Sequence, residues 1–382
     1  MSVGEDRDDL DQPLPLLDLI AEAQRVLAIC NACRYCEGYC AVFPALERRL
    51  SFAERDVHYL ANLCHNCGAC LYACQYAPPH EFHLNLPRVL AKVRNRTYRQ
   101  YAWPTFVAAA FERNGAMVAA VMALSLVILL VFTAWFASPA RFVAAFSDAQ
   151  GSFYALLPHS AMSAVFGAVF ALVVIALAIS FARFWASMGE AADGASLIQT
   201  ARDAATLKYL DGGGDGCTYP RDSPSFIRRN FHHLTFYGFV ACFAATVVAT
   251  FDHYVLHSPA PYPFFSAPVL LGTIGGLSLL AGTAGLLALM HRRDPDLGDD
   301  HQHGMDTGFL VLLFITGLTG LLLLMLRETR AMGPLLAIHL AAVLALFLTL
   351  PYGKFVHALY RFAALAQFHR ERAEPLINAT PE

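Results

Sequence analysis

The chain has 382 residues, of which 57% are hydrophobic and only 15% are charged. Soluble domains carry about 25% charged residues, so this composition, with a mean hydropathy of +0.45, favours residence in a membrane. The net charge of −3 gives no support for a nucleic-acid partner. Residues 1–12 are acidic and polar and lack the apolar segment of a secretory signal, so the N-terminal part is expected in the cytoplasm.

Eight of the ten cysteines form two runs with the same C-x-x-C-x-x-C-x-x-x-C spacing. This pattern is typical of [4Fe–4S] clusters, and in two-cluster ferredoxins the fourth cysteine of each run binds the other cluster. Zinc or disulfides are the alternative, which a repeated run of four in a reducing compartment disfavours. The predicted ligands are Cys30, Cys33, Cys36 and Cys74 for one cluster, and Cys64, Cys67, Cys70 and Cys40 for the other.

The segments around the cysteines read as helix. The stretch 41–63 is rich in helix formers and poor in β-branched residues, and the segment before Cys30 has helical periodicity. This resembles the α-helical ferredoxin of iron–sulfur subunits in respiratory dehydrogenases. We therefore expect a mainly α protein with a cytoplasmic two-cluster domain over 1–100 and a membrane domain over 101–382. His65, inside the second run, is expected on the surface.

Six stretches lack Asp, Glu, Lys and Arg and are long enough to cross a bilayer, which takes about 20 residues. Only Arg141, Arg327 and Arg330, of 27 lysines and arginines, fall on one side of the resulting topology. The positive-inside rule then predicts a multi-pass protein of the bacterial inner membrane with both termini in the cytoplasm. The predicted spans are Ala116–Phe136, Ser160–Ala182, Leu234–Phe251, Ala267–Met290, Gly308–Leu326 and Gly333–Gly353.

The cytoplasmic connection over 189–230 contains a helical piece followed by a glycine-rich turn that includes Cys217. Two interpretations stay open for it: a plain loop, or a segment that docks on the cysteine-rich domain or on a partner.

Histidines at the ends of the predicted spans suggest b-type haem, because polar residues in membrane segments are costly and usually functional. His339 and His357 lie 18 residues apart, about five helical turns or 27 Å, so one helix could supply a ligand near each membrane face. Histidines expected at the same depth in the membrane are His233 and His357, which we predict as ligands of an inner haem, and His253 and His339, which we predict as ligands of an outer haem. The rivals are His159, His232 and His257, and the alternative for any one histidine is a role as an interfacial anchor.

Several stretches carry family resemblances. The segment from His339 to His357 resembles the haem-binding helix of nitrate reductase gamma subunits. The whole chain, with LKYLDGGGDGCTYP, RRNFHHLTFYGF and six spans, resembles tricarballylate-utilisation protein B (the CitB-like family) and the C-terminal half of the CobZ flavo-haem protein. That resemblance implies an electron-transfer subunit of flavoprotein:quinone type. It would reoxidise the FADH2 of a separate dehydrogenase acting on a tricarballylate-like substrate and pass the electrons to quinone.

No G-x-G-x-x-G after a strand is present, so the flavin is expected on a separate chain. Two other functions remain open. One is a haem-free iron–sulfur anchor that reduces quinone directly, with histidines lining the quinone pocket. The other is a redox sensor, which the short segment after Arg361 disfavours because it leaves no room for an output domain.

Overall fold

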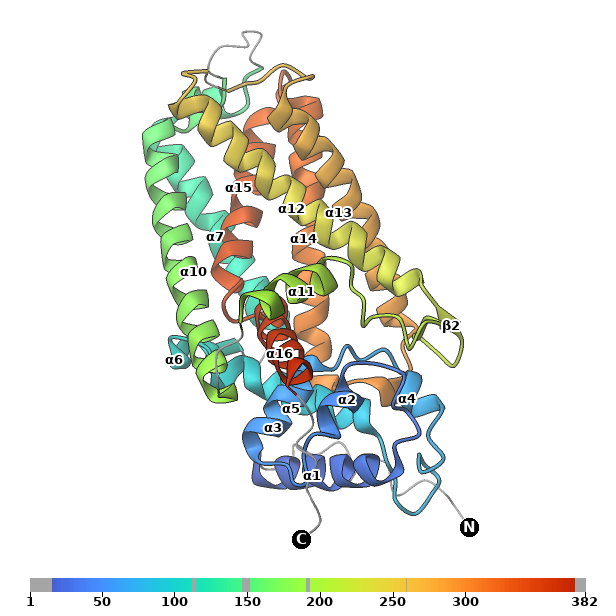
Figure 1. Ribbon diagram of the computed structural model, residues 1–382. Helices are drawn as coiled ribbons and strands as arrows, with labels where there is room; N and C mark the ends of the chain where they lie inside the picture. The colour runs from blue at the N-terminus through green and yellow to red at the C-terminus, as the bar shows by residue number, and fades with distance from the viewer. Residues whose placement is uncertain (1–15, 112–114, 146–151, 190–192, 259, 375–382) are drawn as a thin grey trace.

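The computed structural model describes residues 16–111, 115–145, 152–189, 193–258 and 260–374. These residues are mainly helical, as the sequence predicts, with a single two-stranded antiparallel sheet among them. Figure 1 shows a long helical bundle standing on a small domain of short helices. We refer to residues 16–100 as the head and to residues 115–374 as the membrane domain.

The head is built from short helices around the two cysteine runs. In α3, the Asp56 carboxylate accepts a hydrogen bond from the backbone N–H of Ala53 at 3.0 Å, which fixes the first turn of the helix. In α5, the Asn85 side chain accepts from Arg88 N at 3.0 Å. The prediction of helix over 41–63 is confirmed. The head helices are α1 (Leu16–Cys33), α2 (Val42–Leu46), α3 (Glu54–Leu63), α4 (Ala69–Tyr72) and α5 (Leu86–Gln100).

The membrane domain contains six helices that are long and apolar enough to cross a membrane, one for each predicted span. Helices α12 and α13 approach closely at glycines: a Cβ on Gly238 would lie 2.8 Å from the Leu279 backbone nitrogen. The six helices are α7 (Gly115–Phe136), α10 (His159–Met188), α12 (Ile227–Tyr254), α13 (Ala267–His291), α14 (Asp300–Leu326) and α15 (Met332–Thr349).

Short elements connect these helices. Helices α8 and α9 lie on the side away from the head, and the remaining connecting elements, whose bounds close this paragraph, lie on the head side (Figure 1). The strands β1 and β2 pair Cys217 with Ser225. The bounds are α6 (Thr105–Ala110), α8 (Pro139–Phe142), α9 (Ser152–Leu156), α11 (Gly194–Ala205), β1 (Cys217–Thr218), β2 (Pro224–Ser225) and a 3₁₀ turn, η2 (Pro295–Leu297).

The last predicted span differs from the expectation. Helix α15 ends at Thr349, and a separate helix, α16 (Val356–Ala373), follows. Pro351 lacks the N–H that a continuing helix needs, and it disfavours helical geometry at the residue before it. His339 and His357 therefore lie on different helices, so the expectation that one continuous helix carries both is wrong.

Helix α16 joins the membrane domain to the head. Its residues Ala364, Leu365 and Phe368 belong to the same buried core as α1, α2 and α3. A largely buried ion-pair network closes this contact, because Arg49 binds Glu371 at 2.5 Å and Asp56 at 2.8 Å. The Glu371 carboxylate also accepts from the Tyr59 hydroxyl at 3.2 Å.

A Glu371→Gln substitution is expected to lower the stability of the docked head by about 2–3 kcal/mol, because it removes one carboxylate from a buried arginine. Thermal unfolding of the detergent-solubilised protein measures this effect. An Arg25→Gln control breaks an exposed pair with Glu22 and should cost less than about 1 kcal/mol. Equal losses in the two variants would contradict a special role for the buried network.

Candidate functional site

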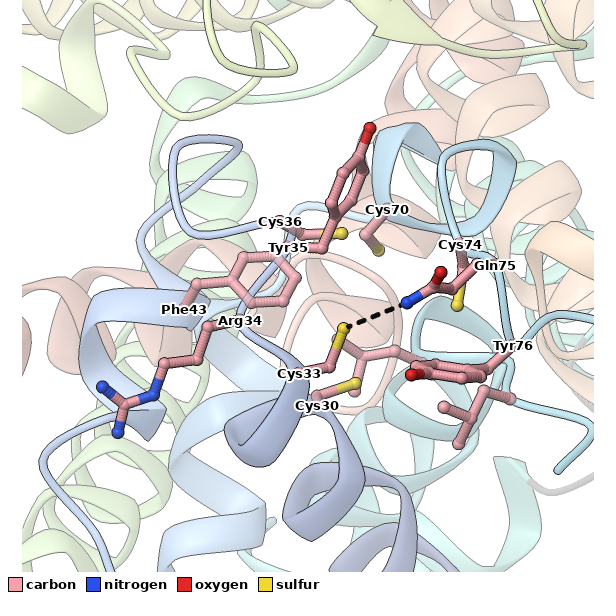
Figure 2. Close-up of a pocket in the computed structure, with 12 residues that line it drawn as sticks. Cys30, Cys33, Arg34, Tyr35, Cys36, Phe43, Cys70, Cys74, Gln75 and Tyr76 are labelled. Atoms are coloured by element: carbon pink, nitrogen blue, oxygen red, sulfur yellow. Dashed lines mark hydrogen bonds between the residues drawn. The ribbon is translucent and has the colours of Figure 1, made fainter.

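The first group of cysteines surrounds one pocket in the head. Cys30 and Cys33 lie in the last turns of α1, and Cys36 lies in the turn that follows. Cys74, from just after α4, completes the ring around the same pocket, and Cys70 reaches its edge. Figure 2 shows these side chains converging, with the Gln75 amide 4.0 Å from the Cys33 sulfur.

The pKa values reflect how closely these thiols lie. Burial, together with the neighbouring thiols of Cys74, Cys36 and Cys33, raises the pKa of the Cys30 thiol to about 12. Burial also raises the pKa of Cys36 to about 12, again with contributions from Cys74 and Cys33. The structure therefore brings together the three cysteines of the first run and the last cysteine of the second run.

The second group forms around Cys40. Burial raises the pKa of this thiol well above its usual range, and the thiols of Cys67 and Cys64 raise it further. Burial and the thiols of Cys67, Cys64 and Cys40 likewise raise the pKa of Cys70. The thiol of Cys36 also raises the pKa of Cys70, so Cys70 lies between the two groups.

The donor sets fit clusters better than single ions. Among the described residues, no three His, Cys, Asp or Glu side chains lie close enough to hold one metal ion. A tetrahedral zinc site with bonds of about 2.3 Å would draw its sulfurs to within roughly 4 Å of one another. A [4Fe–4S] cluster instead takes one thiolate on each of four irons, so a wider ring of thiols suits it. The division of ligands between two clusters remains a prediction.

The glycine-rich connection docks on the head, which resolves the two interpretations left open by the sequence. A Cβ on Gly68, in the second cysteine run, would lie 2.3 Å from the Thr218 carbonyl oxygen. Gly213 also approaches the first run, since a Cβ there would lie 3.0 Å from the Gly38 carbonyl oxygen. Cys217 is fully buried and donates from Sγ to the Leu210 carbonyl at 3.5 Å. It packs in the same buried cluster as Cys67 and raises the pKa of the Cys67 thiol, a contact that no spacing in the sequence reveals.

Three arginines surround the backbone of the second run, and we call them the arginine cluster: Arg94, Arg228 and Arg361. Arg94 and Arg361 each donate to the Cys64 carbonyl at 2.9 Å. Arg228 donates to the Asn66 carbonyl at 2.6 Å and stacks over the Tyr219 ring at 4.2 Å.

The arginine cluster concentrates positive charge at a place where Arg94 is buried and Arg228 and Arg361 are half-buried. Burial, Arg94 and Arg228 lower the pKa of Arg361 to about 10. No carboxylate among the described residues is found paired with any of the three guanidinium groups. Buried charges without a counter-ion are costly, so this arrangement is suited to an anionic group beside Cys64. His65 is also buried there, with 7% of its surface exposed, so its expected surface position is wrong.

The inner histidines pair differently from the predicted match. The His357 ring faces His232, with centroids 6.2 Å apart and planes at 81°. His233 instead lies against Tyr237, with centroids 5.9 Å apart. The Nδ1 of His357 contacts the Lys354 carbonyl at 2.5 Å, which leaves Nε2 for a ligand. Burial and Arg361 lower the pKa of His357, so the neutral imidazole that binds metals is favoured.

The outer histidines also pair differently. His253 stacks on His159, with centroids 3.8 Å apart and planes at 18°. No ring contact between His253 and His339 is found in the described part of the chain. His339 instead hydrogen-bonds Thr319, with its Nδ1 3.1 Å from the hydroxyl oxygen. His257, the remaining rival, is exposed in the loop after α12.

A cysteine-rich head packed beneath six membrane-length helices defines a membrane-bound iron–sulfur protein of electron transfer. The comparisons with known proteins agree with this class. The Fer4-like domain of citrate utilization protein B matches residues 23–100, and the citrate utilization protein B family matches residues 113–377. The citrate utilization protein B of Escherichia coli is 50% identical over 354 residues, which cover 92% of each chain. The chain belongs to the citrate utilization protein B family. No solved structure matches it.

Proposed function

We propose that this chain reoxidises the reduced flavin of a separate dehydrogenase and passes the electrons through two [4Fe–4S] clusters, and through b-type haem, to membrane quinone. The observation that carries the proposal is the order of the two cysteine groups. The first group opens toward solvent, whereas the second is covered by the membrane domain. Such an order supports electron transfer from a soluble donor into the membrane.

The exposed side of the first group suits a protein donor. Arg34, Tyr35 and Gln75 are exposed around this pocket, and Tyr35 keeps 68% of its surface accessible. Aromatic and arginine side chains are enriched in the contacts between proteins. The donor is an FAD-dependent dehydrogenase of a small tricarboxylic acid, and it would dock over this surface.

The second group receives electrons beside the arginine cluster. An oxidised [4Fe–4S] cluster with four thiolates is an anion, and reduction adds one more negative charge. Positive charge close to the cysteines stabilises the reduced state. The arginine cluster therefore favours transfer of the electron from the first group toward the second, which lies against the membrane domain.

His232 and His357 are the side chains that would hold an inner haem. Two histidines that held one iron between their rings would need ring centroids on the order of 6 Å apart. The observed 6.2 Å fits this requirement. A haem iron bound there would carry one electron at a time between the second cysteine group and the quinone.

The proposed location is the inner membrane, with the head in the cytoplasm. Arg141 belongs to α8, and Arg327 and Arg330 belong to the connection between α14 and α15, at the end of the membrane domain away from the head (Figure 1). The other lysines and arginines of the described residues belong to the head or to the helix ends and connections on the head side. The ends of α1 and α16 also lie on the head side (Figure 1). This arrangement is what the positive-inside rule predicts for a cytoplasmic head.

The experiment is an anaerobic reconstitution. The protein in lipid nanodiscs is mixed with a tricarballylate or citrate dehydrogenase reduced by its substrate, and the iron–sulfur absorbance is followed. We expect bleaching on mixing and recovery when a decyl-chain benzoquinone or a short-chain naphthoquinone is added. A protein that bleaches with dithionite but is not reoxidised by either quinone would overturn the proposal.

The arginine cluster provides a further prediction. An Arg361→Gln substitution should lower the midpoint potential of the second cluster by about 50–100 mV, from the loss of one charge at close range in a medium of effective dielectric constant about 20. A redox titration followed by EPR measures the shift. The matched control, Arg34→Gln, removes a solvent-exposed arginine beside the first group and should leave the second cluster unchanged. A shift of equal size in the control would contradict the assignment.

A further inference from the structure

A cavity of about 470 Å³ lies within the half of the membrane domain that is farther from the head. Helices α12, α13, α14 and α15 form its walls, and the lining is mostly aliphatic and aromatic carbon. Arg327 and Tyr262 lie at its outer end, and Phe239 and Leu346 lie toward the head. Its size falls in the range typical of pockets for small organic molecules, roughly 300–1,000 Å³.

One imidazole lines this cavity, that of His339. The Thr319 hydroxyl lies 2.7 Å from the Ile315 carbonyl, to which it can donate its hydrogen. With the hydrogen placed there, the same oxygen can accept from Nδ1–H of His339, 3.1 Å away. In this arrangement Nε2 of His339 is the nitrogen that can accept a hydrogen bond from a ligand.

Glycines make room for the ring and for a ligand. A Cβ on Gly320 would lie 3.0 Å from Cε1 of His339, so any larger residue there would press on the imidazole. Gly272 lines the opposite wall, where a Cβ would meet only the Cβ of Ala245, at 3.8 Å. The cavity therefore exists because these positions carry glycine and no larger side chain.

The cavity reaches the lipid-facing surface. Phe243 and Phe347 both line it, and both lie within about 6.2 Å of Phe170, as measured between ring centroids. Phe170 and Phe243 keep 41% and 42% of their surfaces exposed on spans α10 and α12. A ligand dissolved in the bilayer can therefore approach between these rings.

The inner end of the cavity lies close to the proposed haem. Phe239 packs against Phe355 with centroids 5.7 Å apart, and Phe355 is two residues before His357. On α12, Phe239 lies seven residues after His232, which is two helical turns on the same face and about 10 Å along the axis. The inner histidine pair is thus about two helical turns away from the cavity.

A second haem fits this cavity less well. Axial ligation in a helix bundle uses two facing side chains, and His339 is the only histidine in the lining among the described residues. His253, its predicted partner, is held against His159 instead. A ligand with a single aromatic ring and a polar edge is smaller than haem and fits a cavity that offers one imidazole better.

We propose that this cavity binds the quinone and its quinol, with a hydroxyl of the quinol donating to Nε2 of His339 and the isoprenoid chain leaving between Phe243 and Phe347. This inference rests on the proposed function. In the reaction, the quinone takes two electrons, one at a time, from the metal centres and two protons from water. Both carbonyl oxygens become hydroxyls, and Nε2 of His339 accepts the hydrogen bond of one hydroxyl in the quinol.

The test measures reoxidation of the dithionite-reduced, fully loaded protein in nanodiscs by a decyl-chain benzoquinone. His339→Leu is expected to slow this step by about tenfold or more, the value of one lost hydrogen bond of about 1.4 kcal/mol. Gly272→Leu, which fills the cavity without altering His339, should raise the quinone concentration for half-maximal rate by a similar factor. Reoxidation by ferricyanide should stay unchanged in both variants.

The control is His159→Leu, which changes a histidine outside the cavity lining and should leave quinone reoxidation unchanged. Loss of one haem per chain in His339→Leu, measured by the pyridine haemochrome spectrum, would overturn the inference because His339 would then be an axial ligand. Unchanged quinone reoxidation in both cavity variants would also overturn it. Wild-type protein that no quinone reoxidises would contradict the proposed function itself.

Discussion

A Cys74→Ser variant is expected to lose the cluster of the first cysteine run, although Cys74 belongs to the second run. In the structure, Cys74 lines the pocket of Cys30, Cys33 and Cys36, and its thiol raises the pKa values of Cys30 and Cys36. We expect iron per chain to fall by about half, from roughly eight to four. EPR of the dithionite-reduced protein should show that the signal of the second cluster survives.

Cys40→Ser should have the reciprocal effect, because Cys40 lies beside Cys64 and Cys67. The matched control is Cys242→Ser, a cysteine of span α12 that is remote from both groups, and it should retain both signals. If each substitution instead damaged the cluster of its own run, the crossed assignment would be wrong.

The second large effect is expected at the inner histidine pair. His232→Leu should abolish the sharp α-band of b-type haem, since this ring lies opposite His357 at a distance suited to one iron. Quinone reduction should fall on the order of a hundredfold or more, because even outer-shell partners of a metal are worth 10–100-fold. Reduced-minus-oxidised absorption spectra of the purified variants measure the haem directly.

The neighbouring residue supplies the control. His233→Leu changes the same residue type one position along α12, where the ring lies against Tyr237 instead. We expect it to keep its haem and most of its activity. Loss of the α-band in His233→Leu with retention in His232→Leu would restore the pairing that matching depth favours.

The helical fold and the spans were predictable because their signals are local. A run of about 20 apolar residues predicts a span by itself, and the helix formers between the cysteine runs predict the helical head. The six predicted spans coincide with six membrane-length helices of the structure. Even there, Pro351 ends the last span early, and only the structure shows that α16 turns back to the head.

The contacts between distant segments were not predictable in the same way. Cys217 lies beside Cys67 because a glycine-rich loop packs against Gly68, which depends on three-dimensional approach and leaves no periodic signal. The arginine cluster gathers residues from α5, α12 and α16. Adjacent histidines on α12 differ only in the direction of the side chain, so depth alone could not separate His232 from His233.

The most direct test of the central claim is an absorption spectrum of the anaerobically purified protein, recorded oxidised, dithionite-reduced and again after addition of a decyl-chain benzoquinone. We expect a broad iron–sulfur bleach with a sharp b-type α-band on reduction, and reversal of both changes with quinone. Folded protein with its full iron content that shows no bleach, or a bleach that quinone does not reverse, would contradict a role in carrying electrons from the head to the membrane.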